Sequence, residues 1–421
     1  MAFEMEAWRR HPGRSCALLF FGAVGAAGVV RVLVGGAFAI SATRVVFNRR
    51  PPTSLFALYR LLNITRPLAL VWRILTAPMR RLPDVFILGE VRCGTTTLAS
   101  LLRHRLSMEG PWTIWDVPLA NDKESFYFVG HYFRVVSPWM YRLCFPLHTP
   151  QTLFGRGRPP KVLYEGCASY LSAPWAPALV RQVIPRPVLV VCLREPVSQH
   201  VSWWRLEQGT HDWAINDLGL GAAFLASPSR HAYPPPDFAS AIRLSRSPEV
   251  VAMWEAAEAL PDAWGDARLQ RLPEWAAPFP NGQLSAFDRM GRYADNIERW
   301  MRHFGRECFV FVSLEELENG DVDRILGRIA TKCVEILGYG PTLHTTPPSH
   351  CTASDQPQRG PQSPPKMNAS ANVPPHLEPD EATLRALGEH YRPHNERLFE
   401  LIGRDLGWHD DPRYWWYRSA A

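Results

Sequence analysis

The chain has 421 residues, of which 46% are hydrophobic and 20% charged, a composition typical of a folded globular protein. Its formal net charge of +6 arises at the beginning of the chain, where residues 1–81 carry twelve Arg and no Lys against two acidic residues. The rest of the chain is net negative, at −4, so the overall charge gives no reason to expect nucleic acid as a partner. Eight cysteines without zinc-site spacing exclude a dense disulfide scaffold.

The first element in chain order is an apolar segment that runs from Cys16 to Ile40 and contains one charge, Arg31. It is long enough to span a bilayer, since about 20 apolar residues suffice. We predict a short tail at 1–15, an uncleaved transmembrane signal anchor at 16–40 and an Arg-rich stem at 41–82. A cleaved signal peptide and a transit peptide are the alternatives. Arginines flank both ends of the segment, so charge does not determine its orientation.

The following residues predict an α/β domain over 83–409 and a C-terminal tail over 410–421. Continuous apolar runs at Val85–Leu88, Val188–Leu193 and Phe309–Val312 are typical of parallel strands buried on both faces. Apolar residues at helical spacing alternate with these runs. Strand–helix alternation predicts a P-loop-like three-layer domain with a mainly parallel central sheet flanked by helices. The helical stripes are Leu98, Leu101, Leu102 and Leu106; Tyr293, Ile297, Trp300, Met301 and Phe304; and Leu384, Leu387 and Tyr391.

Two stretches of the domain lack this alternation. Residues 205–290 are rich in Trp and Pro and predict an irregular insertion, whereas residues 341–375 contain nine prolines and predict a long loop. The aromatic residues around Trp203 and in the terminal "YWWY" suit stacking on sugar rings, core packing or membrane-interface anchoring equally well.

The segment "FILGEVRCGTTTLASLL", from Phe86 to Leu102, has the order strand, glycine loop and helix that is typical of a phosphate-binding loop. A nucleotide triphosphatase also needs a lysine after the second glycine, and Thr95 stands there instead. The cation of this loop is Arg92. Since no strand ends in a convincing metal-holding Asp, hydrolysis of ATP or GTP is disfavoured. A plain glycine turn without a ligand remains the alternative for this loop alone.

A second strand, in "LVVCLREPVSQHVSWW", favours the phosphate interpretation. Arg194 stands at the end of the strand and Ser202 follows eight residues later on the next helix. A guanidinium group with a hydroxyl donor is suited to a second phosphate. Two phosphate sites without metal ligands predict a nucleotide with separated phosphates, such as a 3′,5′-bisphosphate.

Together these motifs resemble the carbohydrate sulfotransferases that use 3′-phosphoadenylyl sulfate (PAPS) as the donor, especially the heparan sulfate type. "LREPVSQHVS" resembles the 3′-phosphate element, which implies that Arg194 and Ser202 bind that phosphate. "KESFYF" resembles the family's "KEPHFF", which implies that Glu124 is the catalytic base; His131 is a rival base. "GEVRCGTTTL" resembles the loop for the 5′-phosphosulfate, implying donor contacts by Arg92, Cys93, Gly94, Thr95, Thr96 and Thr97.

Three more blocks resemble the family, and all six run in family order from about residue 84 to 409: "YEGCASYL", "GRYADNIERWMRHF" and "LFELIGRDLGWH". The resemblance implies sulfuryl transfer from PAPS, without a metal, to a carbohydrate on a polysaccharide, glycoprotein or glycolipid. Glu124 is expected to act as general base and Arg92 to stabilise developing charge. The resemblance also implies a single-pass type II protein of the Golgi membrane with a luminal catalytic domain. The net negative charge of residues 82–421 favours a neutral or weakly charged acceptor.

The sequence departs from the family pattern at three points. Arg92 replaces a lysine, Gly166 stands where the family has the lysine of a Glu-Lys pair, and the family's Gly/Lys loop is not recognisable in 341–375, where Lys366 is a weak substitute. These departures leave two alternatives open. One is a membrane-anchored nucleotide- or glycan-binding pseudo-enzyme, and the less favoured one is a P-loop kinase.

Overall fold

The computed structural model describes residues 72–111, 123–125, 127–128, 141–148, 160–216, 237–258, 287–341 and 378–418. The chain divides into two compact units, and residues 76–212 and 225–421 form the larger one, which contains the sheet and the site described below. The predicted signal anchor at 16–40 lies outside the described residues. Among the helices that are described, none has the length and apolar character needed to cross a membrane.

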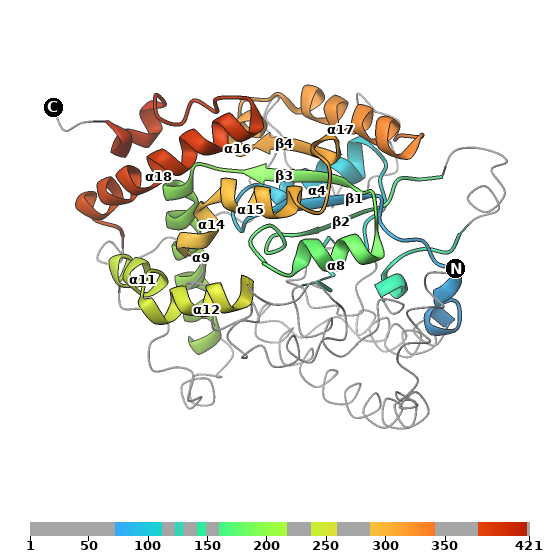
Figure 1. Ribbon diagram of the computed structural model, residues 1–421, viewed down its shortest axis with the longest axis horizontal. Helices are drawn as coiled ribbons and strands as arrows, with labels where there is room; N and C mark the ends of the chain where they lie inside the picture. The colour runs from blue at the N-terminus through green and yellow to red at the C-terminus, as the bar shows by residue number, and fades with distance from the viewer. Residues whose placement is uncertain are drawn as a thin grey trace, which may run out of the picture. The chain divides into compact units, whose positions relative to one another are not determined.

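Four parallel strands form the centre of the larger unit, in the order β2-β1-β3-β4 (Figure 1). All residues of the first three strands are buried, which explains the continuous apolar runs. The predicted strands in β1, β3 and β4 are confirmed, whereas β2 has the sequence YEGC and is not apolar enough to be predicted. The strands are β1 (Val85–Gly89), β2 (Tyr164–Cys167), β3 (Val188–Leu193) and β4 (Phe309–Ser313).

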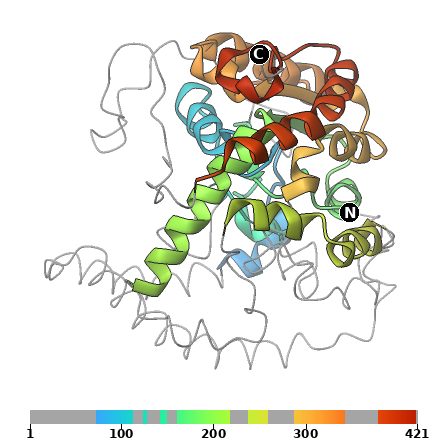
Figure 2. The same cartoon turned by 90° about the vertical axis from the view of Figure 1, so that its left-hand side faces the viewer.

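Helices cover both faces of this sheet, which confirms the predicted α/β architecture (Figures 1 and 2). On one face lie α4 (Thr95–Arg105) and α17 (Val322–Leu337), which contact the strands and each other. On the other face lie α8 (Ala176–Val183) and α15 (Tyr293–Met301). The predicted stripe on α15 is buried in the same core as the strands.

The remaining elements surround this core. They are α9 (Pro196–Asn216), α11 (Phe238–Ser245), α12 (Pro248–Glu258), α14 (Phe287–Gly291), α16 (Leu314–Glu318) and α18 (Glu381–Ile402), with the 3-10 helices η1 (Ala77–Met79), η2 (Arg142–Cys144), η6 (Arg306–Cys308) and η8 (Pro412–Tyr417).

The prediction of irregular structure for residues 205–290 is wrong where the structure describes them, because they contain the second part of α9, then α11, α12 and part of α14. Trp203 and Trp204 are fully buried in an apolar cluster with α11, α14 and α18, which agrees with core packing for these two side chains.

The strand order positions the site. The chain leaves β1 toward β2 at one side of the sheet, and it leaves β3 toward β4 at the other. The boundary between β1 and β3 is therefore the topological switch point, where α/β sheets bind ligands outside the carboxyl ends of their strands. The loop after β1 contains Arg92, and the residue after β3 is Arg194. The topology brings two segments that are far apart in sequence to one edge.

Candidate functional site

The loop between β1 and α4 adopts the compact backbone that a phosphate-binding loop requires. Gly94 has φ +83° and Arg92 has φ +70°, and both values lie in the left-handed region. The N–H of Cys93 donates to the carbonyl of Glu90 at 3.2 Å and closes the turn. Gly94 is the N-cap residue of α4 and offers no side-chain cap, so the positive end of the helix dipole faces the loop.

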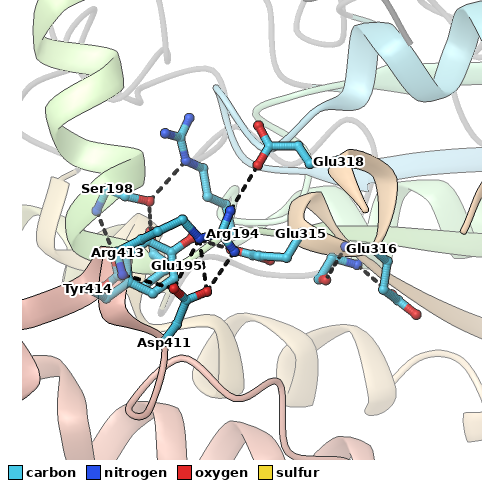
Figure 3. Close-up of polar contacts among 10 residues, drawn as sticks. Arg194, Glu195, Ser198, Glu315, Glu316, Glu318, Asp411, Arg413 and Tyr414 are labelled. Atoms are coloured by element: carbon cyan, nitrogen blue, oxygen red, sulfur yellow. Dashed lines mark hydrogen bonds and ion pairs between the residues drawn. The ribbon is translucent and has the colours of Figure 1, made fainter. Parts of the chain in front are cut away.

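Three of the predicted site residues are joined by hydrogen bonds at the switch point. Arg194 Nη1 donates to the carbonyl oxygen of Arg92 at 3.1 Å, and Arg92 Nε donates to Ser202 Oγ at 2.9 Å. Arg194 Nε donates to Ser198 Oγ at 3.0 Å (Figure 3). Sequence reasoning missed Ser198, although it lies four residues before Ser202 and therefore on the same face of α9.

The electrostatics of this cluster favour an anion. Burial lowers the pKa of Arg92, and the nearby positive charge of Arg194 lowers it further. Two guanidinium groups held this close repel each other, and an anion placed between them relieves that repulsion. Both side chains are half-buried, so their interaction is screened less by salt than that of exposed charges.

The remaining loop residues supply shape and backbone donors. Cys93 is buried beside the hydroxyl of Tyr293, at 3.5 Å, and burial raises the pKa of its thiol to about 12, which keeps the thiol neutral. Thr95 is buried, and Thr96 and Thr97 complete the first turn of α4. Their backbone N–H groups belong to the helix terminus, where anions bind.

Glu124 lies on the β2 side of the site. It forms an ion pair with Lys123, and the side chains are 13% and 2% exposed, respectively. The N–H of Gly166 in β2 donates to the carbonyl of Lys123 at 2.8 Å, which fixes this segment beside the strand. Burial raises the pKa of Cys167, the last residue of β2, and the negative charge of Glu124 raises it further. Glu124 is therefore near the carboxyl end of β2, at the same sheet edge as Arg92.

A second carboxylate on this side, Glu165, is fully buried in β2. It accepts hydrogen bonds from the hydroxyls of Tyr170, at 2.7 Å, Ser125 and Tyr141. Burial raises the pKa of Glu165 to about 7, and the neighbouring charge of Glu124 contributes in the same direction. Sequence reasoning did not assign it a role.

Gly166, where the family resemblance implies a lysine, lies opposite Ile87 of β1. A Cβ atom at this position would be 2.7 Å from the Cβ of Ile87. The two strands thus approach too closely to admit a side chain without a shift of the backbone. The rival base His131 and the substitute cation Lys366 lie outside the described residues.

Comparison with known proteins gives sequence relatives, while no family model matches the chain. The chain is 25% identical over 335 residues to human heparan sulfate glucosamine 3-O-sulfotransferase 6, which covers 78% of this chain and 74% of that protein. It is 27% identical over 128 residues to the Caenorhabditis elegans bifunctional heparan sulfate N-deacetylase/N-sulfotransferase 1, covering 30% of this chain and 13% of that one.

Among solved structures, the chain is similar to a sulfotransferase from Alicyclobacillus acidocaldarius, with a TM-score of 0.41, 18% identity, and coverage of 80% and 100% of the two chains. The sequence relatives agree with the class that the motifs indicate: over 78% of its length the chain is similar to sulfotransferases. Its curated relatives within that class are heparan sulfate sulfotransferases.

Proposed function

We propose that this protein transfers the sulfuryl group of PAPS to a hydroxyl or amine of a carbohydrate. The observation that carries the proposal is the cluster at the switch point, in which Arg92, Arg194 and Ser202 are joined by hydrogen bonds. Two guanidinium groups, a helix N-terminus and a hydroxyl at one sheet edge suit a nucleotide that carries two separated phosphates.

Each side of this cluster would bind one end of the donor. Arg92, with the N–H groups of residues 93–97 at the start of α4, would hold the 5′-phosphosulfate end. Arg194 and Ser202 would hold the 3′-phosphate, and Ser198 would orient the guanidinium of Arg194. A nucleotide without a 3′-phosphate would leave the charge of Arg194 without its ligand. Arg194 would therefore select PAPS over other adenine nucleotides.

The chemical step is an in-line displacement at sulfur. The acceptor oxygen or nitrogen forms a bond to sulfur while the bond from sulfur to the bridging phosphate oxygen breaks, and the bisphosphate PAP leaves. Glu124 would take the proton of the acceptor, a contribution that is typically worth about 10²–10⁴-fold in rate. Lys123 supplies the counter-charge that keeps this half-buried carboxylate in place. Arg92 would stabilise the negative charge that builds on the leaving phosphate.

The acceptor and the location of the protein are part of the same proposal. The names of the relatives state an action on heparan sulfate, which supports a glycan acceptor here. The net negative charge of residues 82–421 favours a glycan with little charge of its own. The apolar segment at 16–40 supports a single-pass type II protein of the Golgi membrane with a luminal catalytic domain.

The test is transfer of sulfur label from radiolabelled PAPS to a panel of glycans by the full chain, compared with its Glu124→Gln variant. We expect Glu124→Gln to lower the transfer rate by about 10²–10⁴-fold and to leave PAP binding unchanged. The matched control is Glu335→Gln, because Glu335 also pairs with a nearby lysine, Lys332, at 2.6 Å on the surface of α17.

Each alternative function predicts a different result. PAP binding without transfer to any glycan would identify a pseudo-enzyme, which is the alternative that Arg92 and Gly166 favour. Phosphate transfer from ATP would identify a kinase. Transfer that survives Glu124→Gln undiminished would remove Glu124 from the mechanism and leave the donor site intact.

A further inference from the structure

The C-terminal segment that follows "LFELIGRDLGWH" contacts the predicted 3′-phosphate element at Glu195, next to Arg194. Residues Pro412–Tyr417 form η8, which packs against α18. The hydroxyl of Tyr417 donates to Glu195 Oε1 at 2.7 Å, and the indole Nε1 of Trp416 approaches the same oxygen at 3.4 Å. The donor–acceptor pair Tyr417–Glu195 joins residues 222 positions apart.

Glu195 stands between this segment and Arg194. Its carboxylate accepts the N–H of Val197 at 2.9 Å and of Ser198 at 2.7 Å, and thereby caps the first turn of α9. Ser198 Oγ donates to the carbonyl of Glu195 at 2.9 Å and accepts from Arg194 Nε at 3.0 Å (Figure 3). The direction of the Arg194 guanidinium therefore depends on where the Glu195 cap lies.

The proton of Tyr417 has a fixed direction. Asn395 Nδ2 donates to the hydroxyl oxygen of Tyr417 at 2.8 Å, and an amide NH₂ group can only donate. The hydroxyl consequently uses its own proton for Glu195. All three side chains are buried, at 5% for Tyr417, 1% for Asn395 and 0% for Glu195, so solvent does not compete for these bonds. Removing the hydroxyl would take one donor from Glu195 and the 2.8 Å acceptor from Asn395, and the position of the carboxylate would then depend on its remaining donors.

We propose that Tyr417 is a positioning residue for the 3′-phosphate of the donor. It holds Glu195, which holds the N-terminus of α9 together with Ser198 and thereby aims Arg194. This inference rests on the proposed function. It has a specific consequence: loss of the Tyr417 hydroxyl weakens binding of nucleotides that carry a 3′-phosphate and spares those that carry only a 5′-phosphate.

The experiment compares PAP with adenosine 5′-monophosphate by calorimetry, using the full chain and its Tyr417→Phe variant. We expect the Kd for PAP to rise about five- to tenfold, within the range typical for loss of one intramolecular hydrogen bond, while the Kd for the monophosphate stays unchanged. Tyr414→Phe is the matched control. Tyr414 lies in the same 3-10 helix, is buried, and donates to a different carboxylate, Glu315, at 2.7 Å.

The ratio of the two Kd values in one preparation does not depend on the folded fraction. If Tyr417→Phe does not fold, Trp416→Phe removes the weaker donor to Glu195, keeps an aromatic ring and gives the same comparison. Equal changes for both nucleotides, or an equal change in Tyr414→Phe, would overturn the positioning role. Absence of PAP binding by the unaltered chain would overturn the proposed function itself, and this inference with it.

Discussion

The two sides of the site are each built on a buried glutamate, and the two glutamates are held in different ways. Glu195, on the side of β3 and α9, accepts the backbone N–H groups of residues two and three positions later in the chain. Glu165, on the side of β2, accepts hydroxyl groups of Ser125, Tyr141 and Tyr170. Both carboxyls are fully buried, and burial raises the pKa of each to about 7.

The two carboxylates therefore differ in whether their hydrogen-bond donors are mainly neighbours in the sequence or come from distant segments. The Glu195 cap is made within a few consecutive residues, to which Tyr417 adds one distant donor, and it places Arg194 and Ser198 by helix geometry. The Glu165 side needs Tyr141 and Ser125, which come from segments 24 and 40 residues away. Hydrogen bonds between sequence neighbours leave a contiguous motif in the sequence, whereas hydrogen bonds between distant segments do not.

The largest expected effect concerns the two buried carboxyls, Glu165 and Glu195, and the way the free energy of unfolding depends on pH. The pKa of each carboxyl rises from its usual 4.5 to about 7 in the folded protein. Between these values the folded state binds more protons than the unfolded state, so the free energy of unfolding falls as pH rises, by roughly 3 kcal/mol for each carboxyl. This stabilisation is fully present below pH 4.5 and lost above about pH 7.

Thermal unfolding at about pH 5 and about pH 8 measures this slope. We expect Glu165→Gln and Glu195→Gln each to remove part of it, since an amide does not titrate. A slope that both variants retain would show that other groups determine the pH dependence of stability.

The next largest effect is expected for Arg194→Lys on the β3 side. Lysine keeps the positive charge but loses the planar fork that contacts Ser198 and the Arg92 carbonyl. Hydrogen bonds to charged groups are worth about 1.5–3 kcal/mol, so the Kd for PAP should rise about 10- to 100-fold. Calorimetry with PAP measures this change. An unchanged Kd would mean that charge alone, without the guanidinium geometry, holds the 3′-phosphate.

On the β2 side, Gly166→Lys restores the residue that the family pattern has. Its Cβ would meet Ile87 at 2.7 Å, so we expect the free energy of unfolding to fall by about 1–3 kcal/mol, as is typical of overpacking. Gly327→Lys on α17 is the control, because nothing lies within 4 Å of the Cβ position there. If Gly166→Lys were as stable as the control and transferred sulfate faster, the close strand approach would not explain the missing lysine.

The smallest effect is expected for Arg92→Lys, which restores the family's cation in the loop. The charge stays the same, and the bond from Nε to Ser202, at 2.9 Å, is lost. Loss of one such bond costs about 1 kcal/mol, so the Kd for PAP should rise about fivefold. A large rise in the transfer rate would instead show that arginine impairs this site.

The sequence by itself determined the parts of this protein that depend on neighbouring residues. The apolar runs of β1, β3 and β4 reflect strands buried on both faces, and the glycine loop before α4 reflects a backbone with positive φ at Gly94. The distance of eight residues from Arg194 to Ser202 placed Arg194 just before α9 and Ser202 about two turns along it. Such spacings are fixed by backbone geometry and remain visible in the chain.

Only the tertiary structure decided which distant residues meet. It placed β2 beside β1, where Gly166 opposes Ile87, and it brought Tyr417 to Glu195 from the other end of the domain. It also showed that Ser198 contacts Arg194, whereas the sequence offered two serines on the same helix face. These contacts depend on how elements pack and on which buried polar groups need a partner, and neither is encoded in the spacing of a single segment.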